Sequence, residues 1–185
     1  DSDDPDEAAA SQSPAHVQSD SPAKTARRLH ELYQRRDYDG IAPMIVQPAR
    51  AQTIDLLQAI AEVLDADASL RGRAEEYYGV PYYATWSLAS IADNLGVFSK
   101  RVKFINQKHR GAEASVTLQE ADHVPLVHAR FELHDNGWLL RPDETPPTLP
   151  ADLRGLAASL REVENDVLSG VAFETYVQSF FDKAV

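Results

Sequence analysis

The sequence contains no cysteine, and other features that would classify a protein quickly are missing as well. Without cysteine there is no disulfide, no zinc ribbon and no thiol nucleophile. It has no run of about 18 apolar residues, so we expect no transmembrane segment. A Walker A loop, a G-x-G-x-x-G fingerprint and a G-x-S-x-G elbow are also absent, so the NTPase, Rossmann and serine-hydrolase classes lack support.

Positive charge is scarce, and the N-terminal segment has none. The 185 residues carry a formal net charge of −11, and residues 1–20 hold six acidic residues but no Lys or Arg. An acidic chain repels phosphate backbones, so we expect no nucleic acid partner. The same segment has no aromatic residue, and Val17 is its one large aliphatic residue. It cannot bury enough apolar surface to offset chain ordering. We therefore expect residues 1–21 to form a disordered acidic tether and residues 22–185 a single domain.

The first residue is Asp1, which indicates that an upstream segment was removed. Removal of a signal peptide would leave an acidic leash followed by a folded domain. We therefore expect an extracytoplasmic protein, either periplasmic or tethered at a membrane surface. A cytoplasmic location is the alternative, because trimming a cytosolic tail would leave the same arrangement.

Helical periodicity dominates the first half of the domain and its end. Ser21 followed by Pro22 predicts a helix N-terminus, and the apolar spacing continues to about Arg36. The other expected helical segments are a short turn at Ile41–Val46, a helix from Pro48 to Tyr78 that stops at Gly79-Val80-Pro81, a third helix from Trp86 to Leu95 with Gly96 beyond its end, and closing helices at Ala151–Leu168 and Phe173 to about Ala184.

Between these helical regions the apolar pattern changes to a period of two, which is typical of strands. We predict strands at Val102–Gln107, Ala114–Gln119, Val124–Leu133 and Trp138–Arg141, joined by Lys108–Gly111, Glu120–His123 and Asp135-Asn136-Gly137. Short joins make an antiparallel meander, and Asn-Gly is a strong hairpin signal. Helices, then a sheet, then helices is an α+β order, so we expect an antiparallel four-stranded meander sheet packed against N-terminal and C-terminal helices. Trp138 is expected to be buried beside Phe131.

Three segments carry a family resemblance. They are the early helix Ala-Arg-Arg-Leu-His-Glu-Leu-Tyr-Gln-Arg-Arg-Asp-Tyr-Asp, the hairpin end Asp135-Asn136-Gly137-Trp138-Leu139-Leu140, and the closing Val163-Glu164-Asn165-Asp166-Val167-Leu168-Ser169-Gly170. Together they span most of residues 24–180 and resemble the nuclear-transport-factor-2-like (NTF2-like, cystatin-like cone) superfamily, in particular exported bacterial proteins of unknown function. The chain departs from the common cone because no clear strand separates the second and third helices. The superfamily hosts isomerases, cyclases, dehydratases and non-enzymatic modules, so the resemblance leaves function open.

An aromatic cluster is the most conspicuous candidate site. Its members, which fall within ten residues beside the Gly-Val-Pro break, are Tyr77, Tyr78, Tyr82, Tyr83 and Trp86. Tyrosine hydroxyls at a cone mouth could donate hydrogen bonds to a ligand oxygen, as in ketosteroid-isomerase-like cones. The alternative is core packing and a lid over the sheet, since aromatic rings supply large apolar area.

Catalytic and metal-binding residues are harder to find. A cone isomerase needs a buried carboxylate as general base, and the candidates are Asp37, Asp55 and Asp93. Asp37 is expected to form a turn at a helix end, and Asp55 and Asp93 are expected on the outward faces of helices. We therefore assign no catalytic residue. His128 and His134 share a strand face about 20 Å apart, and His123 faces the other side, so none of them can share a metal directly. We predict no metal and no cofactor.

A basic patch formed by Lys100, Arg101, Lys103, Lys108, His109 and Arg110 flanks the first hairpin. It is too small to indicate nucleic acid binding in an acidic protein. The polar face of the predicted strand Val124–Leu133 either contacts water or is covered by a partner. A homodimer formed through this face is one option.

Two functions remain open. The first is an exported, non-catalytic binding or interaction domain for a small apolar ligand or a protein partner. The alternative is a small isomerase- or lyase-like enzyme with an aromatic-lined cone cavity. A deep cavity that holds a desolvated carboxylate near a Tyr hydroxyl would favour the enzyme, and a filled cone would favour the binding module.

Overall fold

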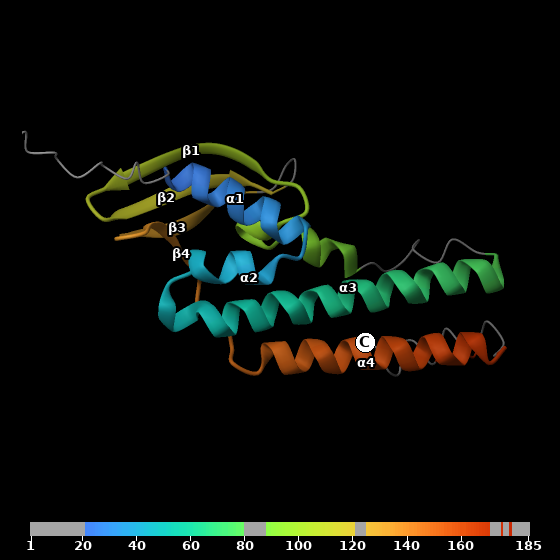
Figure 1. Ribbon diagram of the computed structural model, residues 1–185. Helices are drawn as coiled ribbons and strands as arrows, with labels where there is room; N and C mark the ends of the chain where they lie inside the picture. The colour runs from blue at the N-terminus through green and yellow to red at the C-terminus, as the bar shows by residue number, and fades with distance from the viewer. Residues whose placement is uncertain (1–20, 80–87, 121–124, 171–174, 176–177, 179–185) are drawn as a thin grey trace, which may run out of the picture.

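The sheet is a four-stranded antiparallel meander with helices before and after it in the chain, as the sequence predicts (Figure 1). The computed structural model describes residues 21–79, 88–120, 125–170, 175 and 178. The strands β1 (Lys103–Arg110), β2 (Glu113–Gln119), β3 (Val127–His134) and β4 (Gly137–Arg141) pair in chain order. The expected tether lies outside the described residues apart from Ser21, and so does nearly all of the expected second closing helix.

The helices are α1 (Pro22–Gln34), α2 (Tyr38–Ile41), α3 (Arg50–Tyr78) and α4 (Leu149–Leu168), with short 3-10 turns η1 (Ala42–Met44), η2 (Gln47–Ala49), η4 (Leu88–Asp93) and η5 (Gly96–Phe98). Local cap chemistry sets their ends. The Ser21 side chain accepts a hydrogen bond from the Lys24 amide, as the cap prediction required. Gly79 ends α3 in the left-handed conformation at a φ of 64°.

Several predicted elements are wrong in type or extent. β3 begins at Val127, because Pro125 and Leu126, which were predicted as strand, are not part of it. The described part of the third predicted helix is the 3-10 turn η4, not an α-helix. β1 continues through Lys108–Arg110, which pair with Ser115, Ala114 and Glu113, so the turn is Gly111 and Ala112. The helix predicted from Pro48 begins at Arg50, because Pro48 lies in the separate turn η2.

The apolar side chains form two cores that meet along α3. The first lies between α1, the start of α3 and one face of the sheet, and its fully buried members include Leu29, Ile45, Val116 and Phe131. The second lies between the later half of α3 and α4, and includes Val63, Leu70, Leu160 and Val163. Figure 1 shows α3 and α4 running side by side well beyond the sheet.

Trp138 is buried on the sheet's apolar face, as predicted, with 8% of its surface exposed. It pairs with Leu133, and the neighbouring Phe131 pairs with Leu140 on the same face. The opposite face of β3 carries His128, Arg130, Glu132 and His134, so the predicted alternation is confirmed.

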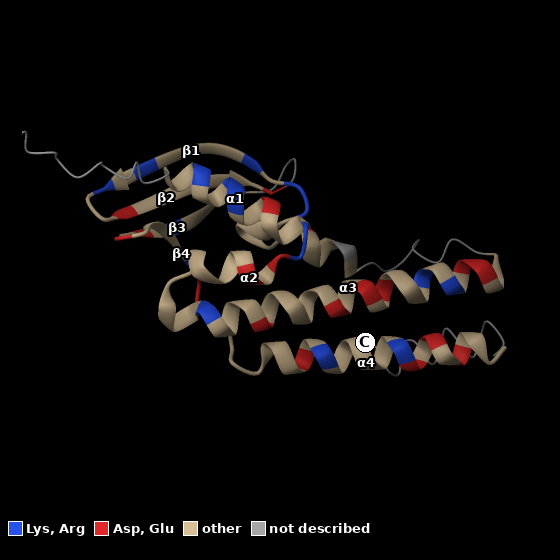
Figure 2. Cartoon of the chain, viewed as in Figure 1, with Lys and Arg blue, Asp and Glu red and all other residues tan. Residues whose placement is uncertain are grey.

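Charges of both signs are interspersed along α3 and α4 (Figure 2). Several connect the two helices: Arg154 of α4 contacts Asp55 at 2.7 Å and Glu62 at 3.2 Å, and Ser69 donates to Glu164 at 2.7 Å. Within the described part of the chain, no helix is long and apolar enough to span a membrane.

Candidate functional site

The two described members of the aromatic cluster lie at the end of α3. Tyr77 and Tyr78 pack edge to face with ring centres 5.6 Å apart, and Tyr77 is 56% exposed. Burial raises the pKa of Tyr78 above its usual value. Neither side chain lines any of the cavities described below. Tyr82, Tyr83 and Trp86 lie outside the described residues, so the role of the cluster stays a prediction.

The three candidate acids occupy separate positions. Asp37 caps α2, where its Oδ1 accepts a hydrogen bond from the Gly40 amide at 2.8 Å. Asp55 pairs with Arg154, and Asp93 lies 3.6 Å from Arg101 through Oδ2. None of the three lines the cavities below, so no acid that the sequence singled out lies in a site.

The histidines of β3 make separate local contacts. His128 Nδ1 lies 3.2 Å from Thr117 Oγ1, and His134 lies 3.5 Å from Glu132. His123 is outside the described residues. In the part of the chain that the structure describes, no group of three or more His, Asp or Glu side chains is arranged to hold a metal.

A cavity of about 360 Å³ opens between the sheet and the start of α3, and we call it the sheet–α3 cavity. It exists because β4 is short: its residues pair with Arg130–His134, so Val127–Ala129 of β3 have no β4 residue beside them. The chain leaves the sheet at Pro142 and passes over this gap toward α4. Gln52 anchors that connector by donating to the Thr145 carbonyl at 2.9 Å.

The walls of the sheet–α3 cavity are mainly apolar. The lining side chains without charge or hydrogen-bonding groups are Leu56, Leu57, Ile60, Leu95, Val97, Phe98, Leu118, Val127, Ala129, Leu140 and Pro142. Charged residues stand around them: Arg130 pairs with Asp143, and Arg141 lies 3.0 Å from Glu132. Among the described residues that line this cavity there is no tyrosine.

Glu120 is the buried carboxylate of this cavity. It is 7% exposed, and its Oε1 accepts hydrogen bonds from the Gly96 amide at 2.5 Å and from Ser99 Oγ at 2.8 Å. Ser99 itself is fully buried and also accepts from the Leu95 amide at 2.8 Å. Both hydrogen bonds end on Oε1, so Oε2 receives none from the described residues. Glu120 therefore fixes the 95–99 turn with one oxygen, and it lines both this cavity and a smaller hollow beside Lys100 and Lys103.

The sequence predicts Glu120 as part of the join Glu120–His123 and not as a site residue. The alternation of β2 contained the signal, because Ala114, Val116 and Leu118 are buried on one face of the strand and Glu120 continues the same phase. A carboxylate that follows an inward-facing series is expected to face inward. What the pattern could not show is the gap beside β3 that leaves room in front of it.

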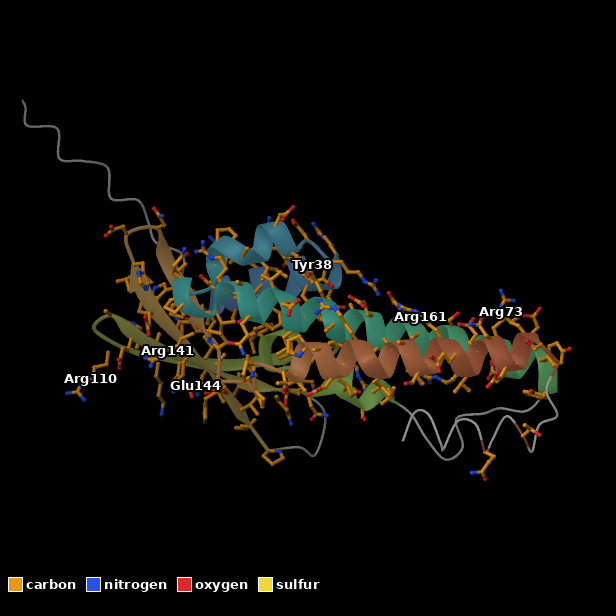
Figure 3. All side chains as sticks on the ribbon, turned by 90° about the horizontal axis from the view of Figure 1, so that it is seen from below. Tyr38, Arg73, Arg110, Arg141, Glu144 and Arg161 are labelled. Carbon is orange, nitrogen blue, oxygen red and sulfur yellow. The ribbon has the colours of Figure 1, made fainter. Side chains whose placement is uncertain are left out.

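The predicted basic patch divides between the two ends of β1. Lys100, Arg101 and Lys103 border a hollow of about 330 Å³ with His30 and Glu120. Lys108, His109 and Arg110 border an open hollow of about 400 Å³ on the sheet, with Arg130, Glu132 and Arg141 among its other lining residues. Figure 3 shows Arg110 at the end of the sheet, projecting away from the helices. The patch therefore does not form one continuous surface.

Comparison of the chain with family models, with curated proteins and with solved structures gave no match. Function therefore has to be inferred from the cavities and the groups that line them.

Proposed function

We propose that the protein is a non-catalytic binding module whose sheet–α3 cavity takes a small, mainly apolar molecule that carries one hydrogen-bond donor. The observation that carries this proposal is a cavity with apolar walls and one buried carboxylate, Glu120. Its volume of about 360 Å³ is at the lower end of the range that small-molecule sites use. It is too small for a helix of a partner protein, whose diameter with side chains is about 10 Å.

The energetics explain why both properties of the ligand matter. A ligand that buries about 150 Å² of apolar surface gains about 4 kcal/mol, at about 25 cal/mol per Å². Association costs at least about 4 kcal/mol in lost translational and rotational freedom. Apolar burial alone therefore gives almost no net affinity, and the polar contact decides whether the complex forms. A hydrogen bond to a charged group contributes about 1.5–3 kcal/mol.

The polar contact requires a donor on the ligand. An ionised carboxylate only accepts hydrogen bonds, and Glu120 Oε1 already has two. A ligand amine or hydroxyl can reach Oε2 without competing with Gly96 or Ser99. A ligand carboxylate would instead meet a like charge in an apolar setting, which is unfavourable. We therefore rank amines above alcohols and alcohols above carboxylic acids.

The enzyme alternative has less support. A cone isomerase would need its carboxylate within reach of a tyrosine hydroxyl, and the described residues that line this cavity include no tyrosine. Glu120 is also committed through Oε1 to holding the 95–99 turn, which suits a fixed recognition group better than a proton shuttle. The NTF2-like resemblance and a location outside the cytoplasm stay predictions from the sequence.

A matched series of six-carbon probes tests the proposal: hexylamine, hexanol and hexanoate, titrated into ¹⁵N-labelled protein and followed by NMR. We expect saturable shifts at residues 94–98, 118–120 and 127–129, in the affinity order amine, alcohol, carboxylate. Ala129→Met, which fills the cavity, should weaken all three probes, whereas Ala151→Met on the exposed start of α4 should weaken none. Absence of saturable binding by any probe would refute the proposal.

A further inference from the structure

The side of the molecule formed by α1 and β1 is cationic, although the chain as a whole has a formal net charge of −11. We call it the α1–β1 surface. The two elements contain one acidic residue, Glu31, and six Lys or Arg residues, all of them exposed: Lys24, Arg27, Arg28, Lys103, Lys108 and Arg110. Figure 2 shows Lys and Arg positions on both elements. This surface therefore differs in sign from the rest of the protein.

α1 and β1 lie side by side and run in opposite directions. The Ala23 amide donates a hydrogen bond to Gln107 Oε1 at 2.9 Å. One turn later in α1, the guanidinium carbon of Arg27 lies 5.6 Å from the ring centroid of Phe104. The cations of α1 therefore lie beside the middle of β1, between the two ends of the predicted basic patch. Together the two elements form the continuous surface that β1 alone does not.

Much of this positive charge is not balanced by its neighbours. Arg27, Lys108 and Arg110 form no ion pair with any described residue, and Arg28 lies 3.9 Å from Glu31. Glu113 of β2 is opposite Arg110 in the strand register and offsets part of the charge at that end. The surface as a whole keeps an excess of cations, so an anionic partner is the one that suits it.

The same surface contains a free strand edge. β1 is the first strand of the sheet and pairs with β2, and within the described residues no strand pairs with its other edge. Proteins protect such edges with charged side chains or cover them with another segment, because a bare edge can pair with a strand of another molecule. A segment that covers this edge has to be compatible with its cations.

A segment of opposite charge precedes α1 in the same chain. Residues 1–20 contain six acidic residues and no Lys or Arg, and five of the six fall within residues 1–7. The segment joins the domain at Ser21, next to the contact between Ala23 and Gln107. At a maximum of about 3.5 Å per residue, residues 8–20 span about 45 Å, whereas an eight-residue strand is about 26 Å long. The acidic residues are therefore close enough in sequence to reach every cation of the surface.

We propose that residues 1–7 bind back onto the α1–β1 surface of their own chain through their carboxylates and cover the free edge of β1. Each exposed ion pair is weak, but a short tether gives an effective concentration on the order of millimolar, so several weak pairs act together. The bound segment excludes other anionic partners and foreign strands from this edge. The inference goes beyond the function proposed above, because the α1–β1 surface shares no residue with the described lining of the sheet–α3 cavity.

A spin label near the start of the chain tests this contact. The chain has no cysteine, so Ser2→Cys provides a single site for a nitroxide among the acidic residues. The full chain, labelled with ¹⁵N, is compared by NMR with the nitroxide active and reduced. At about 0.01 M salt, where the Debye length is about 30 Å, we expect amide signals of residues 103–110 to broaden more than those of α4. In about 1 M NaCl, where that length is about 3 Å, the selective broadening should be lost.

Charge variants in the same labelled chain separate ion pairing from simple proximity. The double variant Lys108→Gln, Arg110→Gln should weaken the broadening of β1, because it removes two cations of the surface. Its matched control, Arg73→Gln with Arg161→Gln, changes the net charge equally at exposed positions of α3 and α4 (Figure 3) and should preserve the broadening. Replacing the five acidic residues of 1–7 with Asn or Gln should abolish it.

Four outcomes would overturn the inference. They are equal broadening of β1 and α4, broadening of β1 that persists in 1 M NaCl, an equal effect of the two double variants, and broadening that survives neutralisation of residues 1–7. A mixture of ¹⁵N-labelled chain without nitroxide and unlabelled chain with nitroxide tests whether the contact is within one molecule. We expect no broadening in this mixture, and selective broadening of β1 there would assign the segment to a second copy instead.

Discussion

Replacing Trp138 with alanine removes the largest side chain from the apolar face of the sheet. The side chain is 8% exposed, pairs with Leu133 across β3 and β4, and lies 6.3 Å from the ring of His109 between centroids. Loss of a buried Trp destabilises a protein by about 3–5 kcal/mol, from lost burial and the cavity that remains. For a domain of this size, about 2–4 °C of Tm per kcal/mol predicts a fall of about 6–20 °C.

Urea unfolding followed by far-UV circular dichroism measures this change directly. Leu139→Ala is a suitable control, because the neighbouring Leu139 points to the other face of β4 and is only half-buried. We expect Leu139→Ala to lower the free energy of unfolding by less than about 1.5 kcal/mol, because a partly exposed side chain makes fewer contacts. A loss below about 1 kcal/mol in Trp138→Ala would refute the packing described for this face.

Two further predictions address the second core and the pH range of stability. Leu160 is fully buried between α3 and α4, so Leu160→Ala should lower the free energy of unfolding in urea by about 2–5 kcal/mol. Leu168→Ala, at an exposed position of α4, is the control, and a larger loss in this control would contradict the α3–α4 packing. Because the folded pKa of Tyr33 is raised to about 12, its contribution to stability is complete below about pH 10 and is lost as the pH rises toward 12. Tyr33→Phe should flatten the fall in unfolding free energy between pH 9 and 12, and an unchanged pH profile would show that Tyr33 is not buried.

The elements that local chemistry determines could be predicted from the sequence. Ser21 and Pro22 define the start of α1 because capping involves only adjacent residues. Asn136 and Gly137 predicted the hairpin between β3 and β4, where Gly137 adopts a positive φ of 112°. The short joins between strands predicted the meander. The alternation of apolar and polar residues along its strand predicted that Trp138 is buried.

The elements that depend on distant partners could not be predicted. Lys108–Arg110 are polar and exposed, so their own residue types do not indicate a strand. They belong to β1 because β2 pairs with them. The stretch after Leu88 has helical spacing but forms a 3-10 turn, tied by the bond from the Lys100 amide to the Ala92 carbonyl.

The candidate sites were the least predictable part, because each cavity is assembled from distant segments. The sheet–α3 cavity requires the short β4, the anchored connector at Thr145 and the turn that Glu120 holds. A smaller hollow lined by Tyr33, Tyr38 and Lys100 likewise joins residues more than 60 positions apart in sequence.

The central claim is that Glu120 selects a donor-bearing ligand in the sheet–α3 cavity, and the ratio of hexylamine to hexanoate affinity tests it most directly. In the original protein hexylamine should bind at least about tenfold more tightly, the effect of one charge-assisted hydrogen bond. Glu120→Gln keeps an acceptor oxygen for Gly96 and Ser99 but removes the charge, so the preference should disappear. Glu162→Gln, the same change at an exposed position of α4 outside the cavity, should preserve it, which separates a local contact from the attraction of an acidic protein for any amine. An equal preference in the original protein and in Glu120→Gln would contradict the claim.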